Sequence, residues 1–82
     1  MIQEDAVPNP PDAFASLVNR TFDRPDGLTV TFLERPVFYR LPAGHARYGT
    51  LRARLLEAWS RNLVVRVTAD EDTLVDVEEA GT

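Results

Sequence analysis

The chain has 82 residues, a formal net charge of -4 and 44% hydrophobic residues, a composition typical of one small globular domain rather than a disordered chain. It contains no cysteine and no lysine, because all nine strongly basic residues are arginine. Disulfides, cysteine-ligated metals, thiol nucleophiles and Schiff-base lysines are therefore excluded, which removes much of catalytic chemistry.

The first third of the chain predicts an extended arm followed by a short helix. Residues 1–11 are acidic and then rich in proline, as in loose N-terminal segments, and Pro10 suits the first position of a helix. The cluster over 23–27 contains proline and glycine and predicts a turn. Between them, apolar residues recur at helical spacing and predict an amphipathic helix over about 11–21: Phe14, Leu17, Val18 and Phe22.

The next segment predicts two strands. Residues 28–32 alternate apolar and polar side chains, and 37–41 have the same β-rich composition. Pro36 lies between them and cannot donate to a central ladder, because it has no N–H. The two pieces form either a tight hairpin or one strand bent at a bulge, and we favour the hairpin.

A loop over 42–45 leads into the strongest helix signal, over about 46–61, which Asn62 can close. Arg52 lies inside the apolar arc of this helix, where it can lay its stem on Trp59, extend outward to solvent or pair with a carboxylate from the sheet. We favour a structural ion pair over a ligand contact, because burying an unpaired arginine is costly. The arc that we expect to face the core consists of Tyr48, Leu51, Leu55, Ala58 and Trp59.

The last segment predicts a second hairpin, with strands over 63–68 and 74–78 joined by a polar turn over 69–73. The expected order is therefore α-β-β-α-β-β. It predicts a single α+β domain over 12–79 with a tail over 80–82, in which one or two helices pack on a mostly antiparallel four-stranded sheet. The alternative is an OB-like, partly open barrel with a helix between strands 3 and 4.

The charges are strongly segregated along the chain. Residues 20–66 hold all nine arginines and four acidic residues, a net charge of +5, whereas the two ends together carry -9. Arg47, Arg54 and Arg61 are spaced seven residues apart and line one edge of the predicted helix. We call these three the arginine edge. It is either a strip for an anionic partner or a solvated face neutralised by the acidic C-terminal hairpin.

Other candidate residues carry weaker signals. Phe38 and Arg40 interleave an aromatic ring with a cation, as single-stranded nucleic-acid binders do, although the sequence pI of about 4.8 disfavours such a ligand. His45, in the loop before the helix, is a candidate general base or anion ligand, but a turn or capping role is the simpler interpretation. The acidic turn over 70–72 matches no calcium-binding loop.

These observations predict a small, non-enzymatic cytoplasmic module that binds another protein, including a second copy of itself, and needs no cofactor or metal. The alternative is binding of single-stranded nucleic acid or another anionic ligand on an OB-like scaffold. Catalysis through His45 is the weakest of the three hypotheses. No membrane span or signal peptide is expected, because no apolar run is long enough and the N-terminus is acidic. The predicted binding residues are Arg47, Arg54, Arg61, Phe38, Arg40 and His45.

Overall fold

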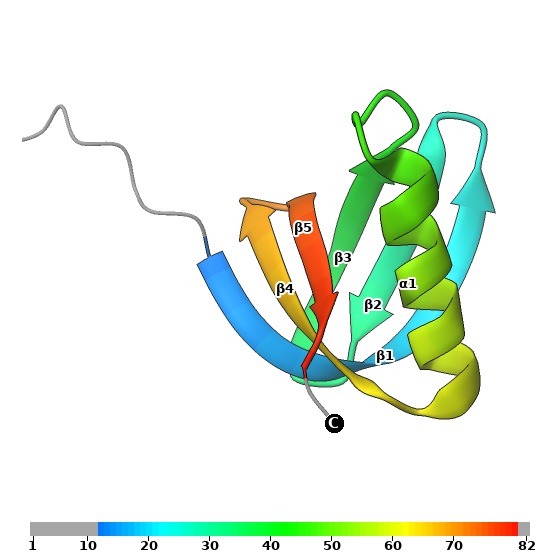
Figure 1. Cartoon of the computed structure of the whole chain (residues 1–82). Coiled ribbons are helices and arrows are strands. Elements are labelled where there is room, and N and C mark those ends of the chain that lie inside the picture. The colour runs from blue at the N-terminus through cyan, green and yellow to red at the C-terminus, as the bar shows by residue number, and fades with distance from the viewer. Residues whose placement is uncertain (1–11, 81–82) are drawn as a thin grey trace, which may run out of the picture.

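The chain folds into a small closed barrel with one helix on its side (Figure 1). The computed structural model describes residues 12–80, so the predicted arm over 1–11 lies outside the described residues. The described elements are β1 (Asp12–Arg24), β2 (Gly27–Phe32), β3 (Arg35–Pro42), α1 (Tyr48–Arg61), β4 (Val64–Asp70) and β5 (Thr73–Glu79).

The strands follow the order β1-β2-β3-β5-β4, and β4 returns to β1 to close the barrel. All neighbours are antiparallel except β3 and β5, which meet at the single parallel pair Arg40 and Thr73. The predicted four-stranded sheet is therefore wrong: over 12–80 there are five strands and one helix. The helix lies between β3 and β4 in the chain, which makes the architecture compatible with the OB-like alternative.

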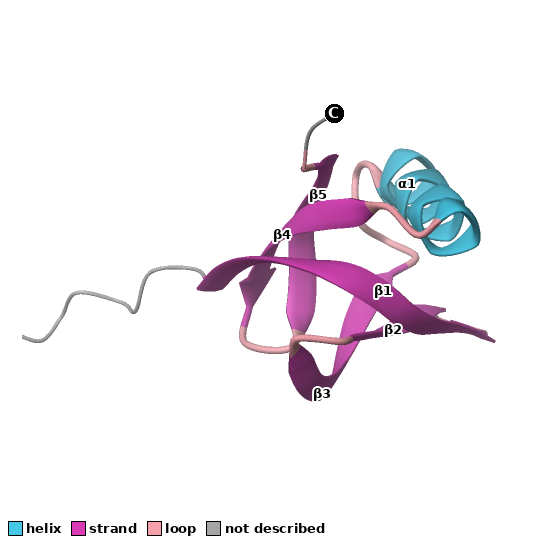
Figure 2. Ribbon diagram, turned by 90° about the horizontal axis from the view of Figure 1, so that it is seen from below, coloured by secondary structure: helices cyan, strands magenta, loops and turns pink. Residues whose placement is uncertain are grey.

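The extra strand is β1, where the sequence predicted a helix over 11–21. The first half of β1 pairs with β4 and its second half pairs with β2, so the long strand curves around the barrel (Figure 2). Ser16 is buried at an inward position and accepts a hydrogen bond from the Glu34 N–H, which hides the alternation expected of a strand. A register shift after Val18 breaks the alternation again. The apolar residues of β1 are therefore spaced as in a helix, although the segment is a strand because it pairs with β4 and with β2.

The two predicted hairpins are confirmed. Strands β2 and β3 pair antiparallel across a turn at residues 33–34, and β4 and β5 pair across a turn at 71–72. Pro36 falls in the irregular stretch of β3, between the pairs Phe32–Arg35 and Val30–Tyr39, where no regular ladder bond is lost.

Helix α1 begins two residues later than predicted and packs across β1 and β5. Its buried residues are Leu51, Leu55 and Ala58, which join the apolar interior of the barrel. Trp59 was expected on this core face but is 41% exposed, so that expectation is wrong. Asn62 closes the helix as predicted, because it adopts the left-handed conformation with φ of 55° and ψ of 48°.

Candidate functional site

The arginine edge of α1 faces the acidic strand β5. The Arg47 guanidinium lies 2.9 Å from the Asp76 carboxylate, and Arg54 donates a 2.8 Å hydrogen bond to the Val77 carbonyl. Arg61 pairs instead with Glu57, one helical turn before it, at 2.9 Å. Arg47 and Arg61 thus each have a carboxylate partner, and Arg54 is held by a backbone carbonyl, which favours the interpretation of the edge as a solvated, partly neutralised face.

His45 ties the loop before α1 to strand β5. Its Nδ1 accepts a 2.9 Å hydrogen bond from the Arg47 backbone N–H, so its Nε2 carries the proton and donates to the Val75 carbonyl at 2.9 Å. Both ring nitrogens are occupied by backbone groups of the same chain. This geometry supports the turn and capping interpretation and offers neither a general base nor an anion ligand.

Arg52 forms the ion pair that the sequence led us to expect. Its guanidinium lies 2.7 Å from the carboxylate of Asp23 at the end of β1. The hydrogen bond to Asp23 holds the pKa of Arg52 above its usual value. Arg52 therefore links helix α1 to the end of β1 through an ion pair at the surface.

A different group of arginines lies on the outer surface of strands β1, β2 and β3. Phe22 is paired with Thr29, and Thr29 is paired with Arg40, so these three side chains form one row across the strands. The row points outward, because Leu28 and Val30 on either side of Thr29 are buried in the barrel. We call this surface the arginine–aromatic face. It comprises Arg20, Phe22, Arg24, Thr29, Phe38 and Arg40.

The two phenylalanines of the face form a platform in which Phe38 is exposed and Phe22 is half-buried. Phe38 is 62% exposed, and its ring centroid lies 6.4 Å from that of Phe22, while the Arg24 guanidinium lies 5.9 Å from the Phe22 ring. Strand β2 also contains a buried polar atom that has no hydrogen-bond partner among the described residues. It is the Thr31 Oγ1 atom, on the same strand as Thr29. A buried hydroxyl in this state lowers the stability of the fold unless a neighbouring side chain moves so that a hydrogen-bond partner can reach it.

The cations of this face are less compensated than those of the arginine edge. Within residues 12–80, Arg20 and Arg24 take part in no ion pair. Arg40 has a loose one, because its guanidinium lies 3.7 Å from the carboxylate of Asp72 in the acidic β4–β5 turn. This turn borders the face, and the Asp72 carbonyl also accepts a 2.7 Å hydrogen bond from the Arg40 backbone N–H.

Sequence reasoning found Phe38 and Arg40 but missed Arg20, Phe22 and Arg24. These three residues alternate along the second half of β1, which is the period of a strand face, but the helix prediction covered the first two. The available signal was the high strand propensity of Thr21 and Phe22, which favours a strand over a helix at this position.

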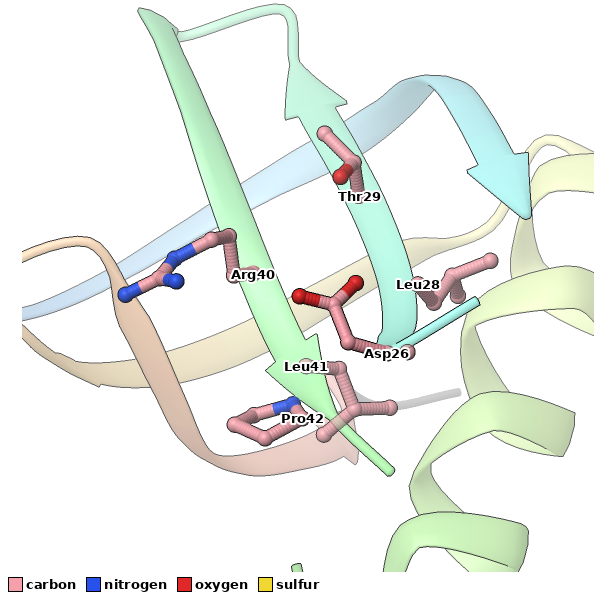
Figure 3. A pocket seen from close by; sticks show the side chains of 7 residues that line it. Asp26, Leu28, Thr29, Arg40, Leu41 and Pro42 are labelled. Carbon is pink, nitrogen blue, oxygen red and sulfur yellow. The ribbon is translucent and has the colours of Figure 1, made fainter. Parts of the chain in front are cut away.

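A shallow pocket with a cavity volume of about 40 Å³ opens at one end of the face (Figure 3). Its walls come from the β1–β2 turn, the start of β2 and the end of β3. The polar side chains that line it are Asp26, Thr29 and Arg40, and the guanidinium of Arg40 points away from the Asp26 carboxylate (Figure 3).

No group of three or more histidine, cysteine or acidic side chains is placed to hold a metal ion in the part of the chain that the structure describes. Among the same residues, no helix is long and apolar enough to cross a membrane. No family model, curated protein or solved structure matches the chain.

Proposed function

We propose that this protein is a non-enzymatic binding module with an OB-like barrel, and that it binds single-stranded nucleic acid on the arginine–aromatic face. The observation that carries the proposal is that the platform of Phe22 and Phe38 lies on the same surface as three arginines. These arginines are Arg20, Arg24 and Arg40. Bases stack on aromatic rings irrespective of sequence, and arginines follow the phosphates.

The strand order supports the same ligand. A barrel in the order β1-β2-β3-β5-β4 with a helix between β3 and β4 matches the wiring of OB-like barrels. Such barrels take oligonucleotides on the outer surface of strands 2 and 3 and on the neighbouring loops. The arginine–aromatic face occupies that surface, and the pocket at Asp26 lies beside the loop between strands 1 and 2.

The proposal is tested by fluorescence anisotropy with labelled single-stranded oligonucleotides of about 12 nucleotides at low salt. Phe38→Ala is the informative variant, because its side chain is exposed and its loss leaves the core intact. We expect the variant to weaken binding about 5-fold or more, since one base loses its stacking partner.

The matched control is Arg61→Ala, which removes an exposed cation of the arginine edge without touching the face. It should leave the affinity within twofold of wild type. Absence of binding by the wild-type protein at low salt contradicts the proposal. So does a Phe38→Ala protein that is folded by circular dichroism and binds as well as wild type.

A second candidate function is protein–protein interaction, including self-association. It is favoured by a cluster of large apolar side chains around the β2–β3 turn, where Leu33 is 59% exposed, Val37 is 45% exposed and Phe38 lies close by in the chain. Exposed apolar clusters mark interaction sites. Sedimentation equilibrium distinguishes the two functions: Leu33→Ser should dissociate a dimer but leave oligonucleotide affinity unchanged, and a strictly monomeric wild-type protein removes the case for self-association.

A further inference from the structure

The pocket beside the arginine–aromatic face contains an acidic side chain that the proposed function does not use. Asp26 lines the pocket together with Thr29, and within the described part of the chain its carboxylate makes neither an ion pair nor a hydrogen bond. A carboxylate repels phosphate, so its place on a cationic surface is unfavourable for backbone binding alone. Its position is better matched to a hydrogen-bond donor of a base.

The β1–β2 turn that carries Asp26 is held by backbone contacts to the segment after β3. The Asp26 carbonyl accepts a 2.9 Å hydrogen bond from the Ala43 N–H, which joins the β1–β2 turn to the segment after β3. Gly27 allows this close approach, because a Cβ atom at that position would lie 2.2 Å from the Leu41 carbonyl oxygen. These contacts fix the backbone of the turn at Asp26 and Gly27, from which the exposed Asp26 side chain projects.

The stacking platform and the pocket are adjacent. Thr29 lines the pocket and is also the residue paired with Phe22 across the sheet. A base that stacks on Phe22 can therefore turn one edge toward Thr29 and Asp26, while the Arg40 guanidinium remains outside the pocket for the backbone (Figure 3). The pocket is too shallow for a whole base, so it would read an edge.

We propose that this pocket selects bases whose Watson–Crick edge carries an amino group next to a ring-nitrogen acceptor, which are cytosine and adenine, because the guanine amino group lies on that edge beside an N–H donor. The carboxylate of Asp26 can only accept, so it takes the amino donor, and the Thr29 hydroxyl donates to the adjacent ring nitrogen. Thymine and uracil present a carbonyl oxygen where the amino group would be, and two oxygen acceptors facing each other repel. This inference rests on the proposed binding of single-stranded nucleic acid.

The test compares two pyrimidine oligonucleotides, oligo(dC) and oligo(dT) of equal length, by anisotropy at neutral pH. We expect the wild-type protein to bind oligo(dC) about 5-fold or more tightly than oligo(dT). Asp26→Asn should abolish this ratio, because an amide can turn its NH₂ toward the thymine carbonyl as readily as its oxygen toward an amino group.

The matched control is Asp72→Asn, which removes a carboxylate that borders the face but does not line the pocket. Both variants lose one negative charge, but only Asp26→Asn should change the ratio between the affinities for oligo(dC) and oligo(dT). Equal binding of the two oligonucleotides by the wild-type protein overturns the inference while the proposed function stands. Failure to bind either oligonucleotide overturns both.

Discussion

The dependence of binding on salt tests how many cations of the arginine–aromatic face contact phosphates. Arg20, Arg24 and Arg40 are the arginines of this face, and the logarithm of affinity for a single strand falls with the logarithm of salt with a slope of about -0.7 for each phosphate neutralised. Three contacts give a slope of about -2, so raising salt from about 50 to 200 mM should weaken binding roughly 20-fold.

Removing one of these cations should change the slope as well as the affinity. Arg24→Ala leaves two phosphate contacts, for which the same rise in salt should weaken binding only about 7-fold. Anisotropy titrations at four or five salt concentrations measure both slopes. Arg54→Ala is the control, because Arg54 donates to the Val77 carbonyl on the other surface. A wild-type slope near zero, or an Arg54→Ala slope reduced as much as that of Arg24→Ala, would refute the assignment of the face.

Two further predictions concern the structural support of the site. Gly27→Ala places a Cβ atom against the Leu41 carbonyl and forces a non-glycine residue to φ of 150°, so we expect a loss of about 2 kcal/mol or more of unfolding free energy, measured by urea denaturation. His45→Ala removes both hydrogen bonds to the Arg47 N–H and the Val75 carbonyl and should lower stability by about 1 kcal/mol, with oligonucleotide affinity unchanged. An unchanged urea midpoint in either variant would show that the contact is not stabilising.

The part of the fold that local patterns determine could be predicted from the sequence. The β2–β3 and β4–β5 hairpins follow from strand composition on each side of a short turn, and α1 follows from apolar residues at helical spacing around Leu51 and Leu55. Strand β1 could not be predicted in this way. It is held by ladder bonds to two strands that lie far from it in the chain, and Ser16 and the register shift after Val18 disguise its alternation.

The sequence predicted residues of the candidate site only on the strand that it also predicted correctly. Phe38 and Arg40 were found because β3 was recognised, whereas Arg20, Phe22 and Arg24 belong to β1 and reach the site through pairing with β2. The arginine edge shows a different limit of prediction from sequence, because here the element was right but its contacts could not be predicted. Its spacing along α1 was read correctly, but spacing does not reveal that β5 brings Asp76 and the Val77 carbonyl against it.

In the folded chain, the segregation of charge along the sequence is partly offset by ion pairs between arginines and carboxylates. Four of the arginines in the basic middle are held by carboxylates at 2.9 Å or closer. Arg35 and Arg47 pair with acidic residues of the two ends, whereas the partners of Arg52 and Arg61 belong to the middle itself. Arg20 and Arg24 take part in none of the ion pairs formed within 12–80, and both lie on the arginine–aromatic face. Because exposed charges are screened beyond about 8 to 10 Å at physiological salt, a ligand on that face responds to these nearby cations more than to the net charge of -4. An acidic protein can therefore hold an anion where arginines without a carboxylate partner among the described residues lie on one surface, as Arg20 and Arg24 do on this face.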